Sequence, residues 1–275
     1  MKNNPNKSRR VVAILSLYAI ISMATMISTQ KLYAQEKGKL TITVTEGNHW
    51  LHSFRIMAVV KVNNPPQIAF WLEDSSGNFV STIFVTHRTA MQDWRPSPGE
   101  KKGEIRRPSS LPVWVHQHQI GGVMTEASCS GCHDYFDKKE KKPAAGSPVD
   151  AITGATPKAG FSREWSVPPS LAPGMYVVKA EINHSKDFND YYSEKAAETD
   201  FAYSGGKMGS GQPSLVWSGK MEIGHGIATA TLKQLGHGHP AGKTGDIYFD
   251  LKNLDTALDI IESIKVKYQV AHSLK

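Results

Sequence analysis

The sequence predicts an all-β fold, an antiparallel immunoglobulin-like sandwich with a long loop insertion. Three observations predict it. Short runs of alternating apolar and polar residues recur along the chain, as in GKLTITVTEG at 38–47. Turn-forming Gly, Pro, Asn and Ser residues separate these runs. Long stretches with helical periodicity are nearly absent, so two packed antiparallel sheets explain the pattern best.

Each expected strand is defined by its alternation and by the turn that ends it. Residues 66–86 read as two strands joined by a Ser-Ser-Gly-Asn turn, and residues 160–183 read as two more joined by Leu-Ala-Pro-Gly. The remaining expected strands are 38–47, 214–223, 226–235, 245–251 and 257–270. The last segment could begin as a short helix, but SIKVKYQV alternates as a strand does.

The N-terminal segment has the layout of a secretory signal peptide. The basic stretch MKNNPNKSRR precedes the apolar stretch VVAILSLYAIISMATMI, and the small residue Ala34 offers a cleavage point. We therefore expect residues 1–34 to be removed and the protein to be periplasmic or otherwise exported. The alternative is a retained membrane anchor, although a bilayer span needs about 20 apolar residues.

Much of the positive charge belongs to this segment. The whole chain carries a net charge of +7, and residues 1–34 hold five basic and no acidic residues, so the rest carries +2. No basic stripe interleaved with aromatic residues is present, and we therefore expect no nucleic-acid partner.

An irregular insertion interrupts the expected sandwich. We place one β-sandwich domain at 38–270 and the insertion within it at 95–158, where Gly, Pro, Lys, His and Ser are frequent. Its stretch SSLPVWVHQHQI at 109–120 is a candidate short helix. Irregular segments this long are uncommon in compact domains and are usually functional, so we look for the site here.

The insertion holds both cysteines of the chain, in the sequence CSGCH. Cys129 and Cys132 lie three positions apart, and His133 follows directly. This pattern resembles the attachment site of c-type cytochromes, in which two thiols bind the haem vinyl groups and the histidine is the proximal iron ligand. The alternatives are a thiol pair or local disulfide, another metal site, or an incidental match. The resemblance covers 129–133 alone, and the flanks are too short and polar for a stand-alone cytochrome domain.

The second axial ligand of such a haem has several candidates. His116 and His118, in the candidate helix, are preferred because they share the insertion with the cysteines. His237 and His239 in LGHGHP are the next pair, and Met124 would raise the potential relative to histidine. For each histidine, an ordinary surface or hydrogen-bonded role is the alternative.

A second motif, DAITGAT, occupies residues 150–156. It resembles the flavin-attachment motif of extracytoplasmic FMN-carrying proteins, with matches at Asp150, Thr153, Gly154, Ala155 and Thr156, whereas Pro157 departs from the Thr or Ser that often follows. The resemblance implies that a flavin transferase joins FMN to Thr156 through a phosphoester, and the acceptor hydroxyl should then lie on an exposed loop. The alternative is an ordinary turn that leads into the next strand.

Longer stretches carry a broader resemblance over most of residues 38–270. These stretches include LTITV, PQIAFWLEDSSGNFVSTIFVT, RRPSSLPVW, LAPGMYVVKAEIN and SLVWSGKMEI. They are similar to a family of predicted periplasmic β-sandwich proteins of unknown function. That resemblance implies flavin transferases and membrane iron–sulfur or haem proteins as associates, and the segment 116–149 looks like an insertion into the family's layout.

These features predict an exported electron-transfer protein with one covalent haem c and FMN as a second candidate cofactor. It would pass electrons between periplasmic or membrane redox proteins, and it would need cytochrome c maturation machinery and, for FMN, a flavin transferase. We expect a carrier rather than a stand-alone enzyme. The main alternative is an exported binding module that holds a metal or small ligand through histidine loops, such as HGHP with His49 and His52. A third is a surface domain with an incidental disulfide.

Overall fold

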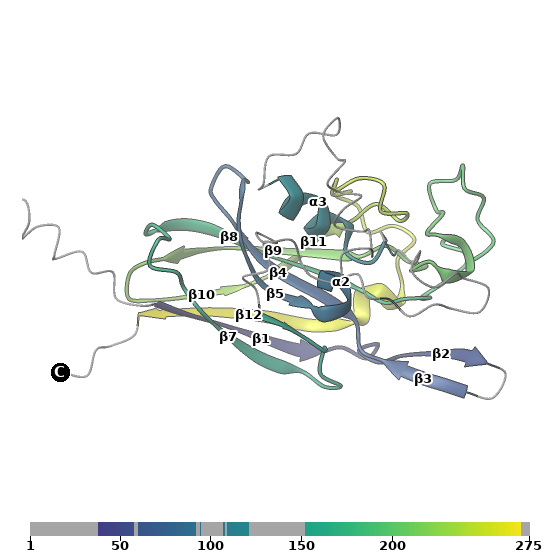
Figure 1. Ribbon diagram of the computed structural model, residues 1–275, viewed down its shortest axis with the longest axis horizontal. Coiled ribbons are helices and arrows are strands. Elements are labelled where there is room, and N and C mark those ends of the chain that lie inside the picture. The colour runs from purple at the N-terminus through teal and green to yellow at the C-terminus, as the bar shows by residue number, and fades with distance from the viewer. Residues whose placement is uncertain are drawn as a thin grey trace, which may run out of the picture.

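Two β-sheets pack face to face in this protein (Figure 1). The computed structural model describes residues 38–57, 60–91, 94, 107, 109–120 and 152–270. The prediction of an all-β antiparallel sandwich is confirmed, because a four-stranded and a six-stranded sheet account for most of the regular secondary structure in the described residues. The immunoglobulin-like arrangement stays a prediction.

The chain crosses several times between the two sheets. The four-stranded sheet contains β1 (Gly38–Glu46), β7 (Phe161–Ser166), β10 (Ile227–Thr231) and β12 (Ile261–Val270). The six-stranded sheet contains β4 (Gln67–Glu73), β5 (Phe79–Thr86), β6 (Ile152–Gly154), β8 (Gly174–Asn183), β9 (Leu215–Ile223) and β11 (Lys233–His237). A separate pair, β2 (His52–Met57) and β3 (Val60–Asn64), extends from one end of the sandwich (Figure 1).

The helical elements are short. They are α2 (His87–Met91), α3 (Pro112–Ile120) and the 3-10 turns η2 (Gly206–Met208) and η3 (Thr256–Asp259). The predicted helix at 109–120 therefore exists as α3. None of the helices in the described part of the chain has the length and hydropathy needed to span a lipid bilayer.

Strand order shows how the sheets are built. The four-stranded sheet runs β10-β12-β1-β7, and the six-stranded sheet runs β11-β9-β8-β4-β5-β6. Neighbouring strands are antiparallel except for β5 and β6, which are parallel and pair Thr86 with Gly154. This parallel pairing places the end of the predicted insertion beside the strand from which the chain entered it.

The main core lies between the two sheets. In β1 the apolar residues Leu40, Ile42 and Val44 are buried and alternate with outward-facing Lys and Thr residues. Alternation of this kind puts one face of a strand in the core and the other in water. The same rule holds for β12, where Ile264 and Val266 are buried.

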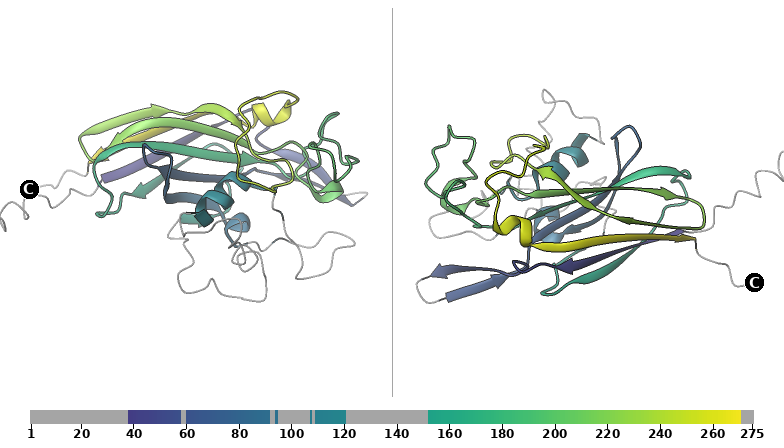
Figure 2. Two further views of the ribbon diagram at one scale, coloured as in Figure 1. Left: turned by 90° about the horizontal axis from the view of Figure 1, so that it is seen from above. Right: turned by 180° about the vertical axis from the view of Figure 1, so that it is seen from behind.

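A second apolar cluster covers the outer face of the six-stranded sheet. Trp71 of β4, Val85 of β5 and Val216 of β9 contact buried apolar residues from 111–115, at the start of α3. The left view of Figure 2 shows α2 and α3 on this side of the sandwich. Strand β4 is therefore buried on both faces, which explains the continuous apolar run IAFWL in its sequence.

Three local predictions differ from the structure. The expected strand 226–235 is divided into β10 and β11, which belong to different sheets. The buried Leu232 lies between them, where the chain crosses from one sheet to the other. Residues 245–251 pair with the sheet at Tyr248 alone, and Ile247 packs on the second apolar cluster instead of joining a ladder. The β2–β3 hairpin was not expected.

Two isoleucines on neighbouring strands test this packing. Ile264 of β12 is fully buried, whereas Ile227 of β10 is 61% exposed. Replacement of Ile264 by Ala should lower the free energy of unfolding by about 2–5 kcal/mol, because it leaves a cavity in the core. The control Ile227→Ala should change it by less than ~0.5 kcal/mol. Urea denaturation measures both, and equal effects would contradict the assigned core.

Candidate functional site

Helix α3 is anchored at its N-terminus by a buried carboxylate from the sheet. Glu181 of β8 accepts hydrogen bonds from the backbone N–H groups of Val113 (3.1 Å) and Trp114 (2.7 Å), and from the Ser214 hydroxyl. The first N–H groups of a helix have no partner within it, and a negative charge there is favoured by the helix dipole. The residue before the helix is Leu111, which offers no capping side chain. The sheet therefore supplies the cap and determines where α3 begins.

Burial makes the Glu181 carboxyl group a weaker acid than an ordinary glutamate. Its side chain is fully enclosed, and this burial raises its pKa from 4.5 to about 7, against the lowering effect of the bonds from Ser214, Trp114 and Val113. The carboxyl group thus titrates near neutral pH while it holds the helix. The sequence contained a signal for this residue, since the glutamate stands between the apolar residues Ala180 and Ile182 of a predicted strand.

Further polar side chains beneath α3 have hydrogen-bond or ion-pair partners. The Trp114 indole N–H donates to Thr82 Oγ1 over 3.0 Å. Beside it, Lys179 forms a buried ion pair with Glu73 at 2.8 Å, and Trp71 donates to the same carboxylate. Buried polar groups that keep their partners fix the orientation of the elements that carry them. Helix α3 is therefore held in one position on the sheet.

This position places His116 against the loop that follows β11. Its Nε2 atom lies 3.3 Å from the Gly242 carbonyl oxygen, to which it donates a hydrogen bond. The helix and loop are so close that a Cβ atom at Gly245 would lie 2.4 Å from His116 Cβ. The side chain of His118, the other preferred candidate, lies outside the described residues.

The second histidine pair lies where β11 ends and this loop begins, with His237 as the last residue of the strand and His239 in the loop. His237 stacks on Tyr248, with ring centroids 5.3 Å apart and an interplanar angle of 12°. Phe201 lies against both histidines: its ring centroid is 6.4 Å from that of His237 and 5.6 Å from that of His239. We call these four residues, with His116, the histidine–aromatic cluster. His116 thus meets the HGH histidines here, although the two are far apart in the sequence.

One histidine of this cluster, His239, has a lowered pKa. Burial lowers the pKa of His239, and nearby Lys243 lowers it further, with smaller contributions from His237 and His116. Asp246 acts in the opposite direction. The His239 imidazole is therefore more often neutral near pH 6.5 than a free histidine.

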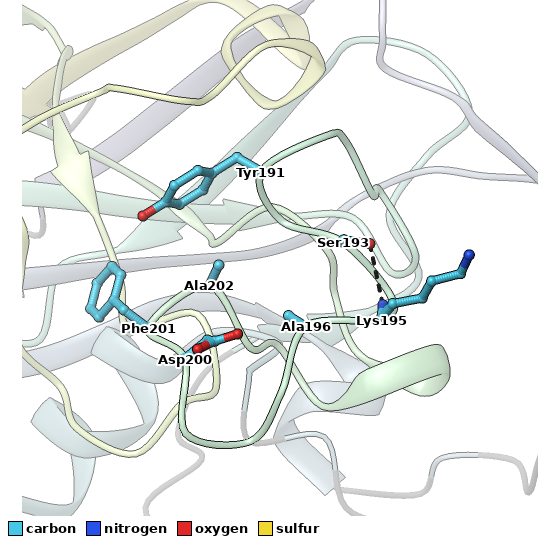
Figure 3. Close-up of a pocket in the computed structure, with 7 residues that line it drawn as sticks. All are labelled: Tyr191, Ser193, Lys195, Ala196, Asp200, Phe201 and Ala202. Carbon is cyan, nitrogen blue, oxygen red and sulfur yellow. Dashed lines mark hydrogen bonds between the residues drawn. The ribbon is translucent and has the colours of Figure 1, made fainter.

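An open pocket lies next to the cluster. It has a volume of about 450 Å³ and shares Phe201 with the cluster; its other lining residues are Tyr191, Ser193, Lys195, Ala196, Asp200 and Ala202. Figure 3 shows Tyr191 and Phe201 on one side of the pocket and Lys195 extending away from them. The pocket offers aromatic surface with charged groups at its margin.

His49 and His52 belong to a different group. His52 Nδ1 lies 3.7 Å from Asp187 Oδ1, and the His52 and His184 rings are 5.4 Å apart. Burial lowers the pKa of His184 to about 3, so this imidazole stays neutral. Within the described ranges, no three His, Cys, Asp or Glu side chains are arranged to hold a metal ion. The structure thus places HGHP with aromatic residues, and His49 and His52 with His184 and Asp187.

The acceptor hydroxyl of the flavin motif is enclosed in the fold. Thr156 is 6% exposed, and its Oγ1 atom donates to the Pro66 carbonyl at 2.7 Å and lies 3.2 Å from Thr86 Oγ1. Thr86 is itself bonded to the Ile68 backbone. The expected exposed acceptor loop therefore differs from the structure, because the residues after β6 pack against β4 and β5.

The remaining motif residues lie outside the described chain. These are Cys129, Cys132, His133, Asp150 and the alternative ligand Met124. The described elements bracket them, since α3 ends at Ile120 and β6 begins at Ile152. The histidine–aromatic cluster is thus next to the point where the chain enters the CSGCH segment.

Comparisons of this chain with protein-family models, with curated proteins and with solved structures found no match.

Titration of Glu181 makes a prediction about stability. Folding raises its pKa, so its proton stabilises the fold fully below about pH 4.5, and this contribution is lost as pH rises through about 7. Between pH 5 and 8 the wild type should lose roughly 2–3 kcal/mol relative to Glu181→Gln, which cannot titrate. Urea denaturation at both pH values measures the difference.

The control is Glu222→Gln, which changes an exposed glutamate on the neighbouring strand β9. It should keep the pH dependence of the wild type. Equal pH dependence in Glu181→Gln and the wild type would contradict the assignment.

Proposed function

We propose that this protein is an exported electron carrier with one covalent c-type haem at Cys129, Cys132 and His133. The observation that carries the proposal is CSGCH, which supplies two thiols at the required spacing and a histidine directly after them. When bound, the haem iron would cycle between ferric and ferrous states and carry one electron. Periplasmic or membrane redox proteins would be its partners.

The described residues fit such a group. A planar apolar cofactor needs an apolar wall and a nitrogen ligand, and the histidine–aromatic cluster offers Phe201 and Tyr248 beside three imidazoles. Cys129 follows the end of α3 by about nine residues, which reach at most ~30 Å when extended. The cluster is therefore within reach of a haem on that segment, and the anchoring of α3 limits how far its attachment point can move.

We propose FMN on Thr156 as a second cofactor. The match of DAITGAT to the flavin-attachment pattern supports it. The enclosed hydroxyl adds a constraint, because a transferase cannot reach it while it is bonded to the Pro66 carbonyl. Attachment would have to occur before residues 152–157 pack on the sheet, or after they open.

A binding module without haem is the second candidate function. The observation that favours it is the 450 Å³ pocket between Tyr191 and Phe201, next to His239. The two candidates differ in colour and in covalent mass, so one preparation distinguishes them.

The haem proposal predicts a coloured protein with added mass. Expressed with cytochrome c maturation machinery, the protein should show a Soret band and a haem-sized increase in denatured mass, because each thiol adds across one vinyl group and no atom leaves. Cys129→Ala and Cys132→Ala should each break one thioether, and the double variant should lose all added mass. Ser130→Ala, at a variable position of the motif, should keep the haem. A colourless protein of unmodified mass would refute the proposal.

The flavin proposal predicts a second mass increment. Co-expression with a flavin transferase should add an FMN-sized mass that is lost in Thr156→Ala and kept in Thr156→Ser, which retains a hydroxyl. Without flavin, Thr156→Ala should lower the free energy of unfolding by about 1 kcal/mol through the lost bond to Pro66. An increment that persists in Thr156→Ala would place the flavin elsewhere, and no increment in the wild type would refute the proposal.

A further inference from the structure

Two aromatic side chains that line the open pocket remain accessible in the folded protein. Tyr191 is 46% exposed and Phe201 is 43% exposed. Both belong to the loop between β8 and η2, and Figure 3 shows them on the same side of the pocket. The π face of an aromatic ring has negative electrostatic character. Accessible rings in a pocket can therefore attract positive charge as well as apolar groups.

Neighbouring residues hold these two rings in place. The Asn189 side chain accepts hydrogen bonds from the backbone N–H groups of Tyr191 (3.1 Å) and Tyr192 (2.7 Å). The Tyr191 ring meets the ring of the buried Tyr192 edge to face, with centroids 4.9 Å apart. Phe201 packs on Tyr248, with centroids 5.0 Å apart. A site whose side chains are already in position loses less conformational entropy when a ligand binds.

Negative charge surrounds the same rings. Asp200 lines the pocket directly before Phe201, and its Oδ2 atom accepts a hydrogen bond from the Ala197 backbone N–H at 3.2 Å. The segment 189–200 carries four acidic residues and one basic residue, a net charge of −3, whereas the whole chain carries +7. The local field at the pocket therefore favours a cation.

The basic groups near the pocket do not occupy the space beside the rings. The Lys195 side chain extends away from Tyr191 and Phe201 (Figure 3). His239 lies behind Phe201, and burial lowers its pKa, so its imidazole is mostly neutral at pH 7. The charge that faces the rings is therefore the Asp200 carboxylate.

The lining also indicates what kind of cation fits. A metal ion needs several oxygen or nitrogen ligands, and Asp200 is the one carboxylate among the described lining residues. A neutral apolar ligand would cover that carboxylate without compensating its charge. A substituted ammonium group matches both features, because its methyl groups pack on the rings while its charge is attracted by the rings and by Asp200. The volume of about 450 Å³ is in the range of small-molecule sites.

We propose that this pocket binds a substituted ammonium group between Tyr191 and Phe201, with Asp200 as the counter-ion. The inference rests on the binding role proposed for the pocket and gives its ligand class. It is independent of the haem.

Titration of the purified protein with choline tests the proposal. Calorimetry should show saturable binding that weakens as salt is added. Dimethylbutanol, a neutral isostere in which carbon replaces the quaternary nitrogen, should bind at least about fivefold more weakly. Asp200→Asn should weaken choline binding about fivefold and leave the isostere unchanged. The matched control Glu198→Gln makes the same charge change in the same loop, outside the described pocket lining, and should weaken choline binding less than about twofold.

Variants of the rings and of the lysine give an independent test. Phe201→Leu keeps apolar bulk but removes the π face, and it should weaken choline binding about three- to tenfold, whereas Tyr191→Phe should bind normally. Lys195→Gln removes a repulsive charge and should strengthen binding about twofold. If Phe201→Leu does not fold, Asp200→Asn and Lys195→Gln keep the test decisive, because both side chains are exposed.

A vesicle experiment identifies the source of the ammonium group. Co-sedimentation with phosphatidylcholine vesicles that free choline prevents would support a lipid headgroup in the site. Choline binding without co-sedimentation would support a small soluble amine.

Three results would overturn the inference. Equal affinity for choline and the isostere would leave the pocket as a binding site but remove the ammonium specificity. Choline binding that is unchanged in both Asp200→Asn and Phe201→Leu would place the ammonium site elsewhere. Binding of neither ligand would refute the inference together with the binding role of the pocket.

Discussion

The hydrogen bonds from the start of α3 to the Glu181 carboxylate are the interaction on which the outer layer of this protein depends. A helix of this length is marginal in water by itself. It forms here because the sheet caps its first turn and because Trp114 and its neighbours cover the face formed by Trp71 and Val85. Enclosing a carboxylate without a cation beside it is unfavourable, and three donors offset much of that cost. The outer layer is therefore positioned by polar contacts as well as by apolar packing.

The two sides of the six-stranded sheet have different roles. The side facing β1 and β12 is an apolar core of ordinary composition, and it supplies the stability of the sandwich. The opposite side combines apolar packing with Glu181, the Glu73–Lys179 ion pair and the nearby histidines. The candidate ligand residues thus lie at the end of β11, in the loop after it and on α3, all of them positioned by one sheet, as in many proteins whose sites lie on loops over a rigid scaffold.

Sequence patterns predicted the strands well because burial on one face leaves a local signature. Alternation defined β1 and β12, and the apolar run of β4 reflects burial on both faces. Local patterns do not show which loops meet, so the approach of His116 to His237 and His239 could not be read from HQH and HGH. The cap on α3 was missed for the same reason, since Glu181 lies far from Trp114 in the chain. The CSGCH segment itself stays a prediction, because it lies outside the described residues.

The parallel pairing of β5 with β6 has a consequence for how this protein can change. The chain leaves the six-stranded sheet after Thr86 and rejoins it at Ile152, beside the same strand, so that Thr86 pairs with Gly154. The Thr86 and Thr156 hydroxyls lie 3.2 Å apart where the two strands end. Loop closure depends only weakly on length, so the sequence between the end of α3 at Ile120 and the start of β6 at Ile152 can be lengthened, shortened or exchanged without moving the sheets. The sandwich with α3 is in this sense a fixed scaffold, and the segment that contains CSGCH is a part that evolution or an engineer can replace as a unit.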